Sequence, residues 1–458
     1  MPHIETYRSP QTPWEVFQKV YSKTKVCFFL DSPRYAPPDQ VYSYMGMDPV
    51  LEISLVKDVL SLKGEVNEKY PGAQIFPVLR KIFEKHRISS EKVPPFFSGG
   101  LAGYFSYEFA PFCDKIRFRQ KTASGTPQLY LGLFKKVIVY DHKKMVYYLV
   151  ANARESEAQG RDVQKLKEYF QEPAVEKKRH FQLKQLMAEM SQKEVEQMVR
   201  TAKEYIAAGD IYQTNLSQRF SFGFSGSSLE LYGKLRTINP SPFCNFFKAG
   251  DLEIISSSPE RLIRKRGDLC ETRPIAGTCP VLGPRNRFRE WRKKLIQNEK
   301  EKAEHLMLVD LERNDLGRVC DYRSVQVKEF MVLEKYSHVV HIVSKIIGKL
   351  RKGKDVFDLI KAMFPGGTIT GCPKIRCMEI IDELEPVSRG IYTGSLGYLD
   401  FYGNMDLNIV IRTIILKKRK GFLQVGAGIV YDSDPKKEYE ETLHKAEALV
   451  KALSEASV

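Results

Sequence analysis

Short runs of aromatic and β-branched residues fill the first 150 positions and predict strands. Residues 137–140 and 145–150 are two such runs, and the polar turn 141–144 between them predicts a hairpin. From about 151 to 190 the chain is polar and has few β-branched residues. This stretch predicts a helix followed by a linker.

A second unit begins with a predicted helix whose start and end are both marked. Ser191 and Glu194 form a capping box, and Gly209 ends the helix. The apolar face of this helix consists of Val195, Met198, Ala202, Tyr205 and Ile206. Beyond it, strand-like runs alternate with helices to the end of the chain.

The last predicted helix begins after Asp434, a natural N-cap, and has Pro435 in its first turn. Its apolar stripe consists of Tyr439, Leu443, Ala446, Val450 and Leu453. In this register Glu438 and Glu441 lie three residues apart on one face of the helix.

The composition of the 458 residues is that of a globular protein, with 43% hydrophobic residues, which excludes disorder for most of the chain. The length allows two or three domains, or one large one. The net charge of +16 raises the question of a nucleic-acid partner. However, the basic tip 417–421 has no interleaved aromatic residues and is interpreted as a solvated hairpin turn, so we expect no such partner.

Neither the first residues nor the cysteines indicate export. The start lacks the charged and apolar regions of a secretory signal, and no stretch approaches about 18 uninterrupted apolar residues, so we expect no membrane span. The eight Cys are scattered and form no Cys-x-x-Cys pair. We interpret them as reduced, buried residues of a cytoplasmic protein.

Two glycine-rich segments have the spacing of nucleotide-binding loops but lack the residues such loops need. In 366–371 the P-loop spacing is followed by Cys372 and Pro373 instead of Lys and Ser or Thr. In 426–428 the third glycine of a dinucleotide-binding motif is replaced by Tyr431. Each loop is either a structural turn or a source of backbone N–H groups for an anionic ligand.

Four carboxylates form two Glu-x-x-Glu pairs on two predicted helices, Glu301 with Glu304 and Glu438 with Glu441. If the helices meet, the four charges repel one another unless a hard cation such as Mg²⁺ neutralises them. If they do not meet, the pairs are two solvated faces. His341 lies among apolar residues, where a lone His more often packs than catalyses.

Many short segments, in order, resemble the chorismate-utilising enzymes. The resemblance is dense from about 190 to 453 and looser before that, through 29–32 and 99–104. The matching segments are 258–261 (SPER), 272–278 (TRPIAGT), 301–305 (EKAEH), 309–315 (VDLERND), 341–344 (HIVS), 364–368 (FPGGT), 371–374 (GCPK), 378–381 (MEII), 411–413 (IRT), 426–428 (GAG) and 438–442 (EYEET).

The resemblance implies an α+β fold in which two large, mostly antiparallel sheets pack as a sandwich with helices outside. It also implies an N-terminal region at 1–170, similar to that of anthranilate synthase component I, and a chorismate-binding catalytic region at 190–453.

The same resemblance assigns roles to individual residues. Mg²⁺ is the implied cofactor, ligated directly by Glu304 and Glu441, and through water by Glu301 and Glu438. Arg412 and Lys445 would pair with the carboxylates of chorismate. The other implied pocket residues are Gly277, Thr368, Tyr392, Gly426, Ala427 and Gly428. The implied catalytic residues are His341, Glu260 and Thr278.

Position 276 separates the groups of the family. Isochorismate-type enzymes and typical aminodeoxychorismate synthases carry Lys there, whereas this chain has Ala276, as anthranilate synthases do. Because Ala has no amine to activate water or attack the ring, water addition is not expected. The segments 366–371, 383–386, 393–398 and 212–216 look more like aminodeoxychorismate synthase component I. We therefore expect amination of chorismate to 4-amino-4-deoxychorismate, with anthranilate formation as the alternative.

The resemblance also implies a partner and a second ligand. The chain shows no Gly-x-Cys-x-Gly nucleophile segment, so a separate glutamine amidotransferase subunit would supply the ammonia. Ser32, Pro240, Ser241 and Pro242 resemble tryptophan-binding elements of the family and form a candidate tryptophan site.

Overall fold

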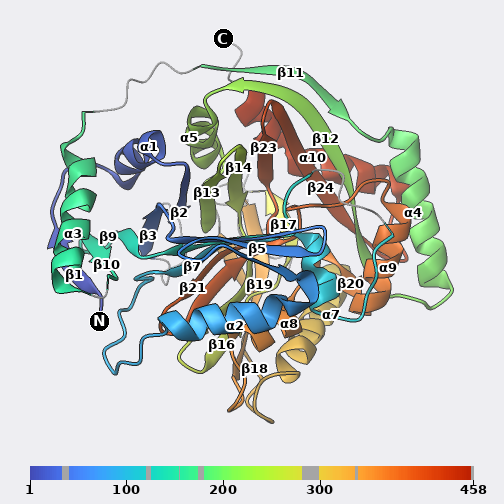
Figure 1. The fold of residues 1–458 in the computed structure, drawn as a ribbon. Helices are drawn as coiled ribbons and strands as arrows, with labels where there is room; N and C mark the ends of the chain where they lie inside the picture. Colours follow the sequence, from blue (N-terminus) through green and yellow to red (C-terminus); the bar gives the residue numbers. More distant parts are fainter. Residues whose placement is uncertain are drawn as a thin grey trace.

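Two large antiparallel sheets form the centre of the molecule, and helices cover their outer faces (Figure 1). The computed structural model describes residues 1–32, 41–119, 125–153, 155–173, 180–280, 299–335 and 339–454. This arrangement is the α+β sandwich that the sequence predicts.

The first sheet contains 12 strands, which we give in spatial order. They are β1 (His3–Tyr7), β10 (Val146–Ala151), β9 (Lys136–Asp141), β3 (Tyr42–Met47), β2 (Val26–Asp31), β13 (Phe243–Ala249), β14 (Leu252–Ser258), β23 (Thr413–Lys417), β24 (Lys420–Ile429), β12 (Gln213–Gly226) and β11 (Phe181–Ala188), with β20 (Gly371–Cys372) paired to β12.

The second sheet also contains 12 strands. In spatial order they are β17 (Ile275–Pro280), β19 (Val339–Lys349), β16 (Leu269–Thr272), β15 (Arg261–Arg266), β22 (Met405–Asn408), β21 (Ser395–Asp400), β7 (Gly100–Phe105), β8 (Leu129–Phe134), β4 (Leu51–Val56), β5 (Val59–Gly64) and β6 (Glu68–Pro71), with β18 (Gln326–Lys335) paired to β19.

The helices connect and cover the strands. They are α1 (Pro13–Lys23), α2 (Ile75–His86), α3 (Ser156–Gln171), α4 (Gln192–Ala207), α5 (Ser228–Ile238), α7 (Glu299–Gly317), α8 (Val356–Met363), α9 (Lys374–Leu384) and α10 (Pro435–Ser454). Three short 3₁₀ turns are η1 (Gly72–Gln74), η2 (Tyr107–Phe112) and η3 (Gly367–Ile369).

The hydrophobic core has three layers. One lies between the two sheets, one between the first sheet and helices α1, α3, α5 and α10, and one between the second sheet and helices such as α2, α7 and α8. Neighbouring residues of strand β2 contribute to two of these layers: Phe28 points into the inter-sheet layer and Phe29 into the helix-facing layer. Because successive side chains alternate in direction, a strand covered on both faces has an almost continuous apolar sequence.

Both sheets draw strands from the N-terminal and the C-terminal regions of the chain. In the first sheet, β2 lies between β3 and β13, and in the second, β7 lies between β8 and β21. The two regions, 1–170 and 190–453, therefore share both sheets, and neither has a sheet of its own.

Several local predictions are confirmed. The hairpin of β9 and β10 forms, and Ser191 and Glu194 make both bonds of the capping box that starts α4. The side chain of Asp434 accepts a hydrogen bond from the Lys437 N–H at 2.9 Å, which caps α10.

Two local predictions need correction. Residues 181–188 form an edge strand, β11, instead of a linker, because β12 offers it a free edge. On α10 the predicted stripe is wrong at Leu443, which is exposed, while Thr442 and Leu449 are buried in its place.

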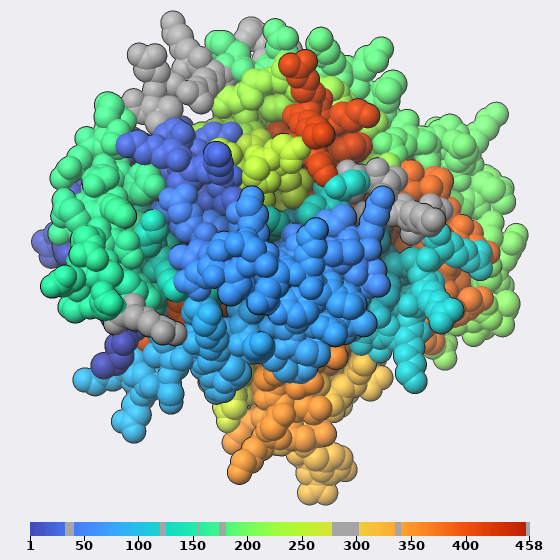
Figure 2. Space-filling model, in the orientation of Figure 1, coloured from blue at the N-terminus to red at the C-terminus, as the bar shows by residue number. Residues whose placement is uncertain are grey.

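Among the described residues, no helix is long and apolar enough to cross a membrane. In the space-filling view, the segment that carries β18 projects from the bottom of the molecule, away from the bulk of both sheets (Figure 2).

Candidate active site

Strand β24 and helix α10 bring together the predicted glycine-rich segment and the predicted lysine. Gly426 pairs with Ser217 of β12, and Gly428 pairs with Asn215. The Lys445 ammonium donates a hydrogen bond to the Gly426 carbonyl oxygen at 2.9 Å. This bond places a cation directly over the segment 426–428.

Gly426 is required by its surroundings. A Cβ atom at this position would lie 2.7 Å from Asn215 Oδ1 and 2.9 Å from the Tyr392 hydroxyl oxygen. The absence of a side chain thus lets the Tyr392 hydroxyl group approach the strand backbone. Burial raises the pKa of Tyr392, so its phenol stays neutral and able to donate a hydrogen bond at ordinary pH.

Arg412 lies between β22 and β23 and adopts a φ of 52°, an uncommon conformation for a side-chain-bearing residue. Burial lowers its pKa, while Tyr392 and Glu447 oppose that shift. A guanidinium group remains charged even so. Arg412, beside Tyr392, and Lys445, bonded to Gly426, therefore supply two cations to this part of the structure.

Glu260 follows β14 and is only 5% exposed. Its Oε1 accepts a hydrogen bond from the Ile275 N–H at 3.4 Å, and its carboxyl group lies against Thr368. Burial, reinforced by the nearby Glu312, raises the pKa of Glu260 to about 8, although Thr368, Ile275 and Lys445 oppose the shift. At neutral pH this carboxyl group is mostly protonated and can donate a proton.

His341 lies on β19, where it pairs with Thr278 of β17 and Glu334 of β18. It is buried. Ala276 pairs with Ile342, the neighbour of His341, so position 276 lies at the same part of the sheet. The backbone of Gly277 and Thr278 is part of β17, but their side-chain surroundings lie outside the described part of the structure.

The four predicted metal ligands lie on α7 and α10. Glu304 is partly buried on α7, a helix that packs on β17 and β19. On α10, Glu441 forms an ion pair with Lys445 at 2.7 Å, and Glu438 accepts a hydrogen bond from the Ser433 hydroxyl at 2.7 Å. The side chain of Glu301 lies outside the described residues.

Within the side chains that the structure describes, no three acidic, His or Cys groups lie close enough together to hold a metal ion. The donor set nevertheless fits Mg²⁺ in kind, because carboxylate oxygens are the ligands this ion prefers. Because the side chain of Glu301 is not described, the structure describes the side chains of only three of the four predicted ligands.

The structure thus places Tyr392 and Lys445 against Gly426, and Arg412 within electrostatic reach of Tyr392. Glu260 lies against Thr368 and within electrostatic reach of Lys445. The elements that carry Glu304 and His341, helix α7 and strand β19, pack on each other beside this group. Side chains from distant parts of the sequence therefore line one candidate active site.

Arg389 is a residue that the sequence analysis did not single out. It lies in the loop after α9 and is almost completely buried. All five of its N–H donors are satisfied, by Glu385 Oε1 and Oε2 at 2.7 and 2.9 Å, by the carbonyl oxygens of Ile369 and Asn215 at 2.8 and 2.6 Å, and by Thr393 Oγ1 at 3.3 Å.

These bonds connect three segments of the candidate site. Ile369 follows Thr368, Thr393 follows Tyr392, and Asn215 pairs with Gly428. The guanidinium group also lies 4.7 Å from the centre of the Tyr107 ring. The spacing of Glu385 and Arg389, four residues apart, was the available signal, but Pro386 removes the helix on which such a pair is normally recognised.

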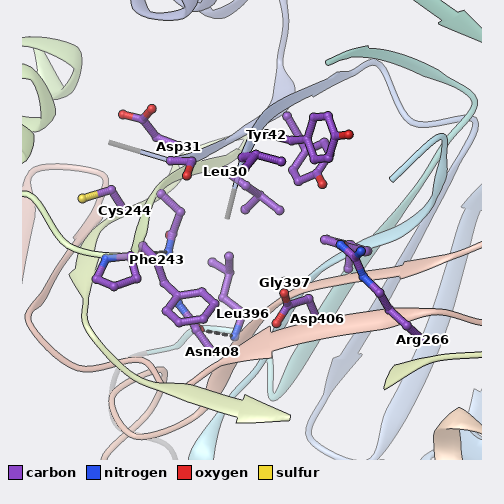
Figure 3. A pocket seen from close by; sticks show the side chains of 16 residues that line it. Leu30, Asp31, Tyr42, Phe243, Cys244, Arg266, Leu396, Gly397, Asp406 and Asn408 are labelled. Carbon is purple, nitrogen blue, oxygen red and sulfur yellow. Dashed lines mark hydrogen bonds between the residues drawn. The ribbon is translucent and has the colours of Figure 1, made fainter. Parts of the chain in front are cut away.

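A cavity between the sheets contains part of the predicted tryptophan site. It encloses about 570 Å³ of empty space, counted with its opening to solvent, and is lined by Ser32 and Pro242 among others. Pro240 and Ser241 precede that lining segment, and the Ser241 N–H contacts the thiol of Cys244 in the cavity wall. Figure 3 shows Arg266 and Asp406 among the side chains that line this cavity.

Comparisons with known proteins identify the family of the chain. The family model for chorismate binding enzymes matches residues 26–451. Aminodeoxychorismate synthase component 1 of Bacillus subtilis is 40% identical over 447 residues, covering 95% of this chain and 93% of the relative. Anthranilate synthase component 1 of Aquifex aeolicus is 41% identical over 469 residues, covering 98% and 94%.

A solved structure shows the same fold. Anthranilate synthase component I from Streptococcus pneumoniae superposes with a TM-score of 0.82 at 33% identity, covering 97% of this chain and 98% of that one. The two shared antiparallel sheets, the gathered site residues and the extent of these matches lead to one conclusion: the chain belongs to the chorismate binding enzyme family.

Proposed function

We propose that this enzyme aminates chorismate with ammonia and forms 4-amino-4-deoxychorismate. The choice of 4-amino-4-deoxychorismate over anthranilate rests on the resemblance of the segments 366–371, 383–386, 393–398 and 212–216. The observation that carries amination itself, as opposed to water addition, is Ala276, which lies on β17 opposite Ile342 and beside His341. A methyl side chain at this place can neither activate water nor attack the ring. Ammonia is then the nucleophile, and the reaction replaces the 4-hydroxyl group of chorismate with an amino group, releasing water.

The cations of the site suit a dianionic substrate. Arg412 and Lys445 would each pair with a carboxylate of chorismate, and the guanidinium of Arg412 can do so through two parallel bonds. The Tyr392 hydroxyl and the backbone N–H groups of 426–428 would hold the remaining oxygens. Lys445 would exchange its present bonds to Gly426 and Glu441 for the substrate.

Glu260 is the proposed proton donor. Its pKa of about 8 keeps the carboxyl group protonated at neutral pH, so it can give a proton to the departing hydroxyl group. His341 and Thr278, opposite each other on β19 and β17, would orient the reacting ring.

Mg²⁺ is the proposed cofactor. Glu304 and Glu441 would hold it directly, and Glu301 and Glu438 through water. When bound, it supplies Lewis-acid assistance to the departure of the hydroxyl group and holds the ring carboxylate. The support for this assignment is the chemistry of the four donors.

Anthranilate synthase activity is the second candidate, because Ala276 is also the residue of that group and a relative of that name is 41% identical. In that reaction ammonia adds to the ring and both water and pyruvate leave. The segments 366–371, 383–386, 393–398 and 212–216 favour the first candidate.

We propose a separate glutamine amidotransferase subunit as the source of ammonia. The relatives from Bacillus subtilis and Aquifex aeolicus are both named component 1 and match over nearly their whole length. A second chain is therefore expected to supply what this one lacks.

The test is to incubate the purified chain with chorismate, Mg²⁺ and ammonium and to identify the product by mass spectrometry. We expect 4-amino-4-deoxychorismate, formed only when ammonium is present. Anthranilate would establish the second candidate instead, and isochorismate would overturn both.

The magnesium assignment has its own test. Glu304→Gln and Glu441→Gln should each abolish Mg²⁺-dependent turnover and weaken the binding of Mg²⁺ measured by calorimetry, while the circular dichroism spectrum is unchanged. The exposed Glu440, on another face of α10, provides the matched control Glu440→Gln. Normal turnover in the first two variants would refute the assignment.

The inter-sheet cavity is the proposed site for tryptophan. Arg266 lines it and has no hydrogen bond or ion pair to any described residue, so it is free to hold the carboxylate of an amino acid. We expect calorimetry to show binding of tryptophan that is lost in Arg266→Met. Unchanged binding in that variant would place the ligand elsewhere.

A further inference from the structure

Glu312 is a buried carboxylate that the proposed reaction does not use. It lies on the inner face of α7, seven residues after the fully buried His305, and is 3% exposed. No ion pair to Glu312 is present among the described residues, since the nearby Lys374 is paired with Asp315 instead. Burying a carboxyl group without an ion-pair partner is costly, and an apolar side chain would serve packing alone better.

The contacts of Glu312 lead to two short segments. Its Oε2 accepts a hydrogen bond from the Thr272 hydroxyl at 3.0 Å. Its carboxyl group also accepts a bond from the backbone N–H of Gly367. A Cβ atom on Gly367 would lie 3.4 Å from Glu312 Oε1, so the approach is close.

Glu260 contacts the same two segments at neighbouring residues. It accepts a bond from the Ile275 N–H, three residues after Thr272, and lies against Thr368, which follows Gly367. Two buried carboxyl groups thus hold the segments 272–275 and 367–368 between them, one from the side of α7 and one from the side of the substrate pocket.

We propose that Glu312 is a positioning residue for Glu260, because its carboxyl group fixes the two segments that hold the Glu260 side chain. The inference rests on the proposed function, which gives Glu260 its proton-donating role. Glu312 itself touches no reacting atom.

The electrostatics point in the same direction. The charge of Glu312 contributes to the raised pKa of Glu260. The pKa of Glu312 is itself raised to about 7, mainly by burial and by Asp315, against the opposing effects of Lys374, Thr272 and Gly367. Lys445 is the cation that faces Glu260 from α10. Removing the charge of Glu312 should therefore make Glu260 easier to ionise.

The test is Glu312→Gln, which keeps the shape but removes the charge and one acceptor oxygen. We expect kcat to fall about tenfold or more, as small misplacements of a catalytic group do, with the KM for chorismate within about threefold. The basic limb of the pH profile of kcat/KM should move to lower pH by roughly half a unit, which a loss of stability alone would not cause.

Asp400→Asn is the matched control, because Asp400 is equally buried and its pKa is raised to about 6, but it binds the backbone of the turn 400–404 instead. Its pH profile should equal that of the wild type. If Glu312→Gln does not fold, the pH profile of Thr272→Val tests the proposal instead. Loss of the Thr272 hydroxyl raises the pKa of Glu312 and should move the same limb in the same direction.

The inference would be overturned if Glu312→Gln folds, keeps kcat within about twofold of the wild type and leaves the basic limb of the pH profile of kcat/KM in place. Hydrogen exchange gives a readout that does not depend on activity, since loss of the bond to Gly367 should speed exchange in 364–371 but not in 400–404. If the wild type converts no chorismate, the proposed function fails. Unchanged exchange in 364–371 would then overturn the positioning role separately.

Discussion

Replacement of Arg389 by Met tests whether the guanidinium group organises the candidate site. Met retains the length and much of the apolar stem but loses all five hydrogen bonds. The buried carboxylate of Glu385 would then lose its guanidinium partner while keeping the hydrogen bonds from the N–H and hydroxyl of Ser217. The carbonyl oxygens of Ile369 and Asn215 would also lose their Arg389 donors.

The expected cost follows from the burial of the pair. The side chains of Arg389 and Glu385 are 1% and 3% exposed, so solvent cannot compensate the remaining charge. Removing one partner of such a pair costs about 3–5 kcal/mol. The double variant Arg389→Met/Glu385→Gln should recover part of this loss, because no buried charge remains unpaired.

Urea unfolding followed by tryptophan fluorescence provides the assay. Arg313→Met is the control, since Arg313 is half exposed and its pair with Asp310 on the surface of α7 is worth at most about 1 kcal/mol. We expect a much lower unfolding midpoint for Arg389→Met than for Arg313→Met. Equal midpoints for these two variants would refute the reasoning, as would a double variant less stable than Arg389→Met alone.

Three further predictions concern single positions. Gly426→Ala should raise the KM for chorismate about tenfold or more, because the new methyl group would lie 2.7 Å from both Asn215 Oδ1 and the Leu216 carbonyl oxygen. An unchanged KM in steady-state kinetics would contradict the proposed placement of the substrate beside Gly426. Gly160→Ala, in α3 with nothing within 4 Å of the new atom, should raise the free energy of unfolding by about 0.5–1 kcal/mol, and a lower unfolding midpoint would contradict this. Since the protonated form of Glu260 predominates below its pKa of about 8, kcat/KM should fall as the pH rises through that value. If the residual activity of Glu260→Gln shows the same fall, a group other than Glu260 causes it.

The parts of the fold that the sequence predicts are those formed by residues that are neighbours in the chain. The capping box of Ser191 and Glu194 and the cap at Asp434 involve neighbours in the chain, so their residues alone predict the helix starts. Strand β11 was missed because its pairing depends on β12, a strand that reaches it only in the folded molecule. The exposed Leu443 has the same origin, since the face of α10 that is covered depends on where α4 and α5 pack.

The candidate site shows a similar division. Resemblance identified Glu260, Arg412 and Lys445, and the structure shows that Lys445 lies against β24 and within electrostatic reach of Glu260. Arg389 was missed because Pro386 removes the helix on which its pair with Glu385 is normally recognised. Glu312 was missed because its partners are a hydroxyl group and a backbone N–H far away in the sequence. For Glu312 a signal existed as well, because it lies in phase with His305 and among the buried apolar residues Leu308 and Leu316 of α7.

The sharing of both sheets has a consequence for the order in which the protein is made. In β2, Phe29 pairs with Phe246 of β13, so the edge of β2 opposite β3 lacks its partner until the chain has grown past that residue. At a synthesis rate of about 5–20 residues per second, the wait is roughly 10–40 s. During that time the apolar strands of the N-terminal region present an open edge to other nascent chains. The time that matters most for the yield of this enzyme is therefore the interval on the ribosome before its first strands find their neighbours.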